Sequence, residues 1–373
     1  MNVPPLISLG NLTPECFLRE YWQKKPLLVR NAMPDFNGLL SPAALKKLAC
    51  HDEAQSRLVI HENQQWQLRH GPFRSQDFRK LSGKQWTLLV QEINHFLPTA
   101  RDLLTQFRFI PHARLDDLMV SYAPEGGGVG PHFDSYDVFL LQGLGTRRWQ
   151  ISAQPDQTLI ADAPLRILEH FHVEQEWLLH AGDMLYLPPQ YAHNGIAEDD
   201  CMTYSIGFRA SCHQELIEQF LIYLQDSIQI EGWYSDPDLQ LQQHPSRIGS
   251  GMQQQTRNIL KKIRWNEMTG EDFLGHYLSE PKSHVFFDPP EQPMTQRQFQ
   301  KHLQESGIKL NLKSRMLTAG NTLFINGEAY PVNKHASATL TKLADDYTLP
   351  AAMPIDKETE ALLYQWYLNG YMD

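Results

Sequence analysis

The chain has 373 residues, of which 42% are hydrophobic and 10% aromatic, a composition typical of a globular protein with two or three domains. Its formal net charge of -10 argues against non-specific binding to RNA or DNA, which requires a basic surface, and leaves basic proteins as possible partners. The four cysteines form no Cys-x-x-Cys pair, and no apolar run is long enough to cross a membrane, so we expect a cytoplasmic protein without a disulfide framework.

The first part of the chain, to about residue 94, is expected to combine short helices with a hairpin. Thr13 followed by Pro14 is typical of a capped helix start. Residues 56–60 and 66–69 have the composition of two strands joined by a polar turn. An amphipathic helix over residues 86–96 is predicted from the spacing of its apolar side chains: Trp86, Leu88, Leu89, Ile93 and Phe96.

Short strands punctuated by Gly and Pro follow, and they predict a jelly roll of the cupin type from about residue 107 to residue 210. Within it, His132 and Asp134 sit two apart in a segment with the pattern of a strand, so their side chains should project side by side. The glycines before this pair would let the backbone approach a ligand closely. The pair is therefore a candidate clip for a metal ion.

A third ligand is available downstream. His193 follows a short apolar strand and the rigid corner Pro188-Pro189. Two histidines and one carboxylate describe the facial triad of non-haem Fe(II) oxygenases, which leaves coordination positions open for chemistry. Other histidines of the same region are rivals for the third position, His180 more than His170 and His172.

A basic pair, Arg147-Arg148, lies in the next strand. An arginine binds a carboxylate through two parallel hydrogen bonds, which suits an anionic cosubstrate. Adjacent residues of a strand point to opposite faces, so at most one of the two enters the barrel, and the residues alone do not choose between them.

Three sequence runs carry a family resemblance: GGGVGPHFDSYDVFLLQGLGTRRW (126–149), GDMLYLPPQYAHNG (182–195) and YSIGFRA (204–210). They resemble the bacterial ribosomal oxygenases of the Jumonji-C (JmjC) class, and the similarity extends over essentially the whole chain.

This resemblance implies an Fe(II)- and 2-oxoglutarate-dependent dioxygenase with O2 as cosubstrate. It implies that the catalytic iron is held by His132, Asp134 and His193. Arg147 would bind the far carboxylate of 2-oxoglutarate, assisted by Ser121. The implied substrate is an arginyl residue of the basic large-subunit ribosomal protein numbered sixteen.

A substrate pocket can be suggested from strand alternation. If Ser121 faces the cosubstrate, then Asp117 and Met119 face the same cavity. Tyr136 would share a face with the metal ligands by the same argument. An acid and an aromatic ring suit a guanidinium substrate through ion pairing and cation–π contact, although they do not exclude a histidyl or lysyl target.

Beyond residue 210 the pattern becomes helical. Residues 211–287 carry apolar stripes at helical spacing, and we expect a helical dimerisation domain that forms a homodimer. Residues 288–373 begin with a Pro-rich linker and continue with helices, a strand and a hairpin at Asn326-Gly327, in an order that resembles a winged helix. This part has slightly more acidic than basic residues, so we expect protein contacts and no direct DNA binding.

The predicted architecture is therefore a mainly β JmjC oxygenase domain over residues 1–210, with its double-stranded β-helix core at about 95–210, followed by the helical and winged-helix domains. Two other functions remain open on the residues alone. The same three ligands could hold zinc in a hydrolase, and a cupin barrel could serve as a non-catalytic binding module.

Overall fold

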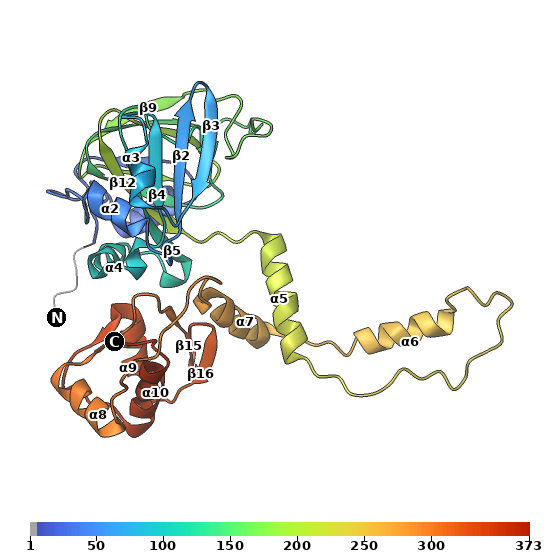
Figure 1. The fold of residues 1–373 in the computed structure, drawn as a ribbon. Helices are drawn as coiled ribbons and strands as arrows, with labels where there is room; N and C mark the ends of the chain where they lie inside the picture. The colour runs from blue at the N-terminus through green and yellow to red at the C-terminus, as the bar shows by residue number, and fades with distance from the viewer. Residues whose placement is uncertain (1–5) are drawn as a thin grey trace. The chain divides into compact units, whose positions relative to one another are not determined.

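The computed structural model of the protein describes residues 6–373, apart from the side chains of residues 267, 268 and 335. The chain divides into two compact units. Figure 1 shows its helices and strands, coloured from blue at the N-terminus to red at the C-terminus. The first contains the chain up to Ala210 together with Lys282–Ser314 and Asp345–Asp373, and the second contains Ser211–Pro281 and Arg315–Ala344.

Short helices and strands precede the barrel. Helix α1 begins where expected, because the Thr13 hydroxyl accepts a hydrogen bond from the backbone N–H of Cys16 at 3.3 Å. The predicted hairpin is confirmed as β2 and β3. The elements are α1 (Pro14–Glu20), β1 (Leu27–Val29), α2 (Pro42–Leu48), β2 (Ser56–Glu62), β3 (Gln65–His70), α3 (Ser75–Arg79), β4 (Trp86–Val90), η1 (Ile93–His95), α4 (Pro98–Thr105) and η2 (His112–Arg114).

The helix predicted over residues 86–96 is wrong. Residues Trp86–Val90 form strand β4, which pairs with β2 on one side and β5 (Leu115–Ala123) on the other, and all five side chains are buried. A strand buried on both faces gives a continuous apolar run, and periodicity alone does not separate such a run from a buried helix. Only the 3-10 turn η1 at Ile93–His95 is helical in this segment.

The barrel consists of two antiparallel sheets, which confirms the jelly roll. One sheet has the strand order β1-β10-β7-β12-β5-β4-β2-β3, and the other has the order β6-β11-β8-β9. The remaining barrel strands are β5 (Leu115–Ala123), β6 (His132–Phe133), β7 (Val138–Leu144), β8 (Arg147–Ser152), β9 (Gln175–Leu179), β10 (Met184–Leu187), β11 (Ala192–Ala197) and β12 (Cys201–Phe208).

Strand β5 divides the apolar core from the interior of the barrel. Leu118, Val120 and Tyr122 belong to the large hydrophobic cluster that packs the N-terminal helices onto the sheet. The alternate residues Met119 and Ser121 therefore face the opposite side of the sheet. That side is available for a functional site.

The C-terminal elements of the first unit are α8 (Gln296–Glu305), β13 (Ile308–Lys309), β17 (Thr348–Leu349) and α10 (Lys357–Leu368). Trp366 and Phe299 are fully buried in this part, and the ring of Phe299 lies 5.3 Å from that of Tyr367. Of the helices and the strand expected after the linker, this part contains the helices α8 and α10 and the two-residue strand β13.

The second unit contains α5 (His213–Ser227), α6 (Ser250–Leu260), α7 (Glu267–Ser279), β14 (Met316–Ala319), β15 (Thr322–Ile325), β16 (Glu328–Pro331) and most of α9 (Lys334–Asp346). The predicted hairpin is confirmed: Asn326 and Gly327 both have positive φ and join β15 to β16. Among the described residues, no helix combines the length and apolarity that a membrane crossing requires.

Candidate metal centre

Two strands of the smaller sheet bring His132, Asp134 and His193 together. His132 on β6 and His193 on β11 are direct partners in the antiparallel ladder, and their ring centroids lie 4.2 Å apart. One carboxylate oxygen of Asp134 lies 3.7 Å from His193 Nε2. The three donor atoms are all within 4.8 Å of one another, so the group is compact enough to hold one metal ion.

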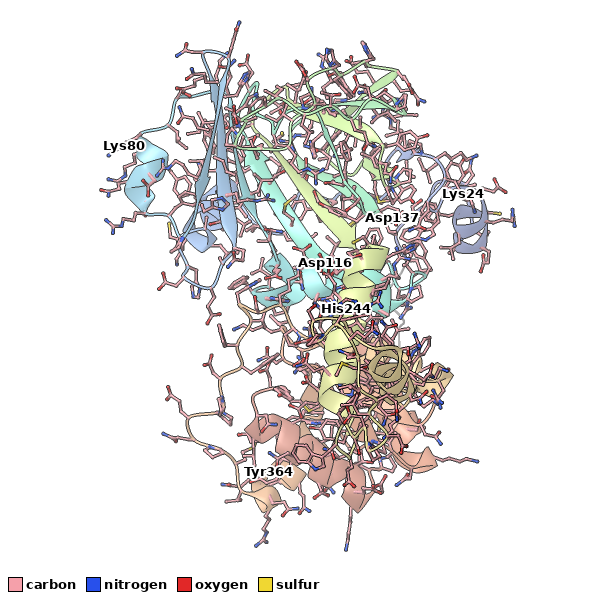
Figure 2. All side chains as sticks on the ribbon, turned by 90° about the vertical axis from the view of Figure 1, so that its right-hand side faces the viewer. Lys24, Lys80, Asp116, Asp137, His244 and Tyr364 are labelled. Carbon is pink, nitrogen blue, oxygen red and sulfur yellow. The ribbon has the colours of Figure 1, made fainter. Side chains whose placement is uncertain are left out.

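The strand expected to carry both His132 and Asp134 is interrupted. Strand β6 ends at Phe133, and β7 begins only at Val138. In the connection, the fully buried carboxylate of Asp137 (labelled in Figure 2) accepts a 2.6 Å hydrogen bond from the hydroxyl of Tyr186. A buried carboxylate requires hydrogen-bond donors, and the connection between β6 and β7 places Asp137 where Tyr186 can donate to it.

Both imidazoles are oriented by the backbone. His132 Nδ1 lies 2.9 Å from the carbonyl oxygen of Gly130, and His193 Nδ1 lies 2.9 Å from that of Tyr191. Such contacts place the proton on Nδ1 and leave the lone pair of Nε2 for a metal. Burial and the neighbouring His132 lower the pKa of His193 to about 4, so this ring is neutral at neutral pH. Two imidazoles and one carboxylate fit Fe(II).

Close backbone approach next to the ligands depends on glycine. A Cβ atom on Gly128 would lie 2.7 Å from the carbonyl oxygen of Gly195, which follows His193 on β11. A Cβ atom on Gly195 would meet the ring of Trp149 at 2.7 Å. Gly128 and Gly195 therefore allow close packing of the backbone next to the ligands.

Strand β8 separates the two arginines that the sequence left undecided. Arg147 is 4% exposed and points into the barrel. Arg148 points outward and forms exposed ion pairs with Glu176 at 3.0 Å and Glu198 at 2.7 Å. Arg147 is therefore the arginine available to a bound anion.

Arg147 is held by hydroxyl groups and not by a carboxylate. Its Nη1 donates to Ser121 Oγ at 3.1 Å and to Thr203 Oγ1 at 3.2 Å. Its Nε is buried without a hydrogen-bond partner, and the structure records no ion pair of Arg147 among the residues it describes. The ring of Trp149 links it to the ligands, 5.7 Å from the guanidinium and 5.9 Å from the ring of His193. A buried, unneutralised guanidinium fits a carboxylate-bearing cosubstrate.

Sequence reasoning missed Thr203. This residue is the ladder partner of Ser121, and its hydroxyl also donates to the side chain of Gln142 at 2.9 Å. Its position could have been inferred from the sequence, because the polar residues Thr203 and Ser205 alternate within the otherwise apolar strand β12.

Strand β5 carries Asp117 and Met119 on the same face as Ser121. Tyr136 lies near Asp117 and Asp134. The carboxylate of Asp117 is buried and accepts a 2.9 Å hydrogen bond from the backbone of Glu92; burial raises the pKa of Asp117 to about 6. Burial and the nearby Asp134 and Asp117 raise the pKa of the Tyr136 phenol. Tyr136 lies in the connection after β6, so its place near these acids does not come from strand alternation.

The rival histidines do not join the metal group. His180 is exposed, and its Nδ1 lies 3.3 Å from the hydroxyl of Thr146. His170 and His172 are exposed as well. Among the described residues, His132, Asp134 and His193 form the single cluster able to hold a metal ion.

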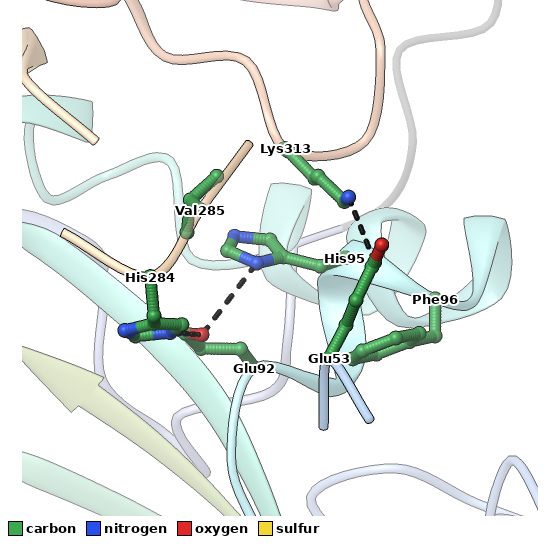
Figure 3. A pocket seen from close by; sticks show the side chains of 7 residues that line it. All are labelled: Glu53, Glu92, His95, Phe96, His284, Val285 and Lys313. Carbon is green, nitrogen blue, oxygen red and sulfur yellow. Dashed lines mark hydrogen bonds and ion pairs between the residues drawn. The ribbon is translucent and has the colours of Figure 1, made fainter. Parts of the chain in front are cut away.

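A second polar cluster lines a small pocket outside the barrel (Figure 3). The buried carboxylate of Glu92 contacts His284 at 2.7 Å and Lys282 at 3.1 Å. Lys313 contacts Glu53 at 2.9 Å. These ion pairs attach residues 282–284 and 313 to the barrel, and each charge in them has a partner.

Comparison with known proteins gives consistent matches. Residues 102–216 match the JmjC domain, and residues 262–373 match the ROXA-like winged helix. The chain is 34% identical over 337 residues to the ribosomal protein uL16 3-hydroxylase of Escherichia coli, covering 90% of this chain and 89% of that protein. It is 38% identical to a probable ribosomal oxygenase of Haemophilus influenzae over 272 residues, which cover 71% of this chain and 65% of that protein.

Solved structures agree with these matches. The structure of YcfD from E. coli covers 99% of both chains, with a TM-score of 0.86 and 32% identity. A second structure, of the ribosomal oxygenase YcfD in complex with cobalt and 2-oxoglutarate, covers 98% of both chains with a TM-score of 0.83 and 32% identity.

Proposed function

The chain belongs to the JmjC ribosomal oxygenases, and on that premise we propose that it is an Fe(II)- and 2-oxoglutarate-dependent hydroxylase of an arginyl residue in the large-subunit ribosomal protein uL16. The observation that carries the proposal is the pairing of the compact His132–Asp134–His193 group with a buried arginine, Arg147, that has no acidic partner among the described residues. A metal ion needs the group of three donor atoms, and a cosubstrate with a free carboxylate needs the buried arginine.

Each of these residues has a proposed role. His132, Asp134 and His193 hold the iron and leave the remaining coordination positions open. Arg147 binds the far carboxylate of 2-oxoglutarate, and Ser121 keeps the guanidinium in place. When bound, the iron and 2-oxoglutarate supply the oxidation of a C–H bond by O2.

The protein's remaining task is to orient the substrate. Asp117 is a buried acid whose pKa is raised to about 6, so at neutral pH it is largely ionised and can attract a guanidinium. Tyr136 is 39% exposed, which leaves part of its ring free to cover the alkyl and guanidinium groups of the target. Met119 is half-buried and provides an apolar contact for the alkyl part of the target side chain. These contacts favour arginine as the hydroxylated residue, and the uL16 3-hydroxylase of E. coli supports uL16 as the substrate protein.

The assembly is proposed to be a homodimer formed through residues 211–287. Helix α5 exposes a set of large apolar side chains: Ile217 at 55%, Leu221 at 58% and Ile222 at 53%. Ile217 and Leu221 lie four residues apart on one face of the helix, and exposed apolar side chains in such an arrangement are typical of a protein interface. We further propose the domain division 1–210, 211–287 and 288–373, activity in the cytoplasm on a ribosomal protein, and no direct binding of DNA by the slightly acidic C-terminal domain.

The test is hydroxylation of a uL16 peptide by protein purified without oxygen and reconstituted with Fe(II). We expect 2-oxoglutarate-dependent addition of one oxygen atom to the target arginine, and no addition when that arginine is replaced by lysine. The Asp134→Ala variant is the matched control, because it removes one iron ligand. Stoichiometric zinc with no response to 2-oxoglutarate would instead support a hydrolase that uses the same donors.

A further inference from the structure

Arg57 lies on the face of the sheet that lines the site, although it is far from the ligands in sequence. It is the ladder partner of Leu89, and Leu89 is the partner of Ser121 on β5. Partners across a sheet share a face, so Arg57, Leu89 and Ser121 point to the same side. The preceding and following residues, Ser56 and Leu58, point to the other side.

The contacts of Arg57 place its guanidinium beside the proposed substrate pocket. Its Nη2 lies 3.9 Å from the sulfur of Met119. Arg57 therefore contacts one of the side chains that we assign to the substrate.

The guanidinium is incompletely bonded. Arg57 Nε is buried and has no hydrogen-bond partner, and the structure shows no ion pair of Arg57 among the residues it describes. A buried charged donor without a partner is energetically costly, so such a donor indicates a missing acceptor. Arg147 shows the same signature at the proposed cosubstrate position.

The charge of Arg57 defines what that acceptor can be. The target guanidinium is cationic and would be repelled by Arg57, so it belongs with the acidic side of the pocket at Asp117. A guanidinium binds oxygen acceptors, and every residue of a polypeptide substrate offers a main-chain carbonyl oxygen.

We propose that Arg57 is a substrate-positioning residue that donates to a main-chain carbonyl oxygen of the substrate polypeptide next to the hydroxylated residue. This inference rests on the proposed function. With the target side chain held at Asp117 and the main chain held at Arg57, the substrate is fixed at two points, and the direction in which the polypeptide crosses the site is set. Two fixed points also determine which C–H bond faces the metal.

The experiment measures binding of a uL16 peptide to protein that carries Mn(II) in place of iron together with 2-oxoglutarate, by calorimetry and without turnover. Hydrogen bonds to charged groups contribute about 1.5–3 kcal/mol, so the Arg57→Gln variant should raise the peptide Kd about 10- to 150-fold. The Kd for 2-oxoglutarate should stay unchanged, which also shows that the variant is folded. Arg57→Lys, which keeps the charge and loses the planar fork, should give a smaller rise.

The matched control is Arg69→Gln on the neighbouring strand β3. Arg69 is the ladder partner of Leu58 and so faces the other side of the sheet, where it pairs with Asp77 at 2.8 Å. This variant should bind the peptide as the unmodified protein does.

Three results would overturn the inference. Equal peptide Kd values for Arg57→Gln and the unmodified protein would show that Arg57 does not contact the substrate. A difference that disappears when the acidic side chains of the peptide are neutralised would assign the acceptor to a side-chain carboxylate. If the unmodified protein neither binds nor hydroxylates the peptide, the proposed function fails and this inference fails with it.

Discussion

Replacing Arg147 by Gln should abolish tight binding of 2-oxoglutarate while leaving the protein folded. The side chain is 4% exposed, and its guanidinium is anchored by the hydroxyls of Ser121 and Thr203 at 3.1 and 3.2 Å. Gln can keep one of these hydrogen bonds, but it has no charge and no fork for a carboxylate. The adjacent Arg148 provides the control, because it lies on the exposed face of the same strand.

The magnitude follows from burial. Removing one partner of a buried, hydrogen-bonded charge pair costs about 2–5 kcal/mol, which corresponds to about a 30- to 4,000-fold rise in Kd. Exposed ion pairs such as those of Arg148 contribute about 0–1 kcal/mol to stability and nothing to a ligand on the opposite face. Because Arg147 is buried without an acidic partner, its removal should leave the melting temperature of the ligand-free protein unchanged or higher.

The assay is calorimetric titration of 2-oxoglutarate into the Mn(II)-loaded protein, with thermal unfolding measured in parallel. Arg147→Gln should show the large rise in Kd and should lose the stabilisation that 2-oxoglutarate gives. Arg148→Gln should bind 2-oxoglutarate normally. Equal Kd values for the two variants, or an equal loss in both, would refute the assignment of Arg147 to the cosubstrate.

Three further predictions concern stability and assembly. In helix α7, Gly275→Ala should cost about 1–3 kcal/mol, because the new Cβ atom would collide with the ring of Phe324. Gly270→Ala, whose new Cβ atom would meet no described side chain, should gain up to about 1 kcal/mol; thermal unfolding compares the two. The pKa of Asp117 is raised to about 6, so the folded state binds this proton more tightly than the unfolded state does. The free energy of unfolding should therefore fall by up to about 3 kcal/mol as the pH rises from about 4 to about 6. In denaturant unfolding, the Asp117→Asn variant should lack this fall, and a pH profile identical to that of the unmodified protein would contradict the prediction. Leu221→Glu, on the exposed face of α5, should convert the proposed dimer to a monomer in light scattering, and an unchanged mass would place the interface elsewhere.

The metal group was predictable because its members are marked by local sequence. His132 and Asp134 are two residues apart, and His193 follows a rigid Pro-Pro corner. Short-range spacing and turn chemistry are the signals that a sequence carries most directly. The structure brings the three side chains within 4.8 Å, although Asp134 lies just beyond the end of its strand.

Other features depend on strand register and could not be predicted in the same way. Thr203 reaches Arg147 because β12 pairs with β5, and Arg57 reaches the site through two further ladders, β2 with β4 and β4 with β5. Register between strands distant in sequence is set by the folded sheet as a whole. The error at residues 86–96 has a related cause: a strand buried between two others has no alternation to reveal it.

The mass of uL16 isolated from ribosomes of cells with and without this gene tests the proposed substrate most directly. We predict that fragments carrying one arginine lose a single-oxygen increment when the gene is deleted. The normal gene should restore this increment, and a His132→Ala variant should not. An unchanged mass of uL16 in the deletion strain would contradict the proposed substrate.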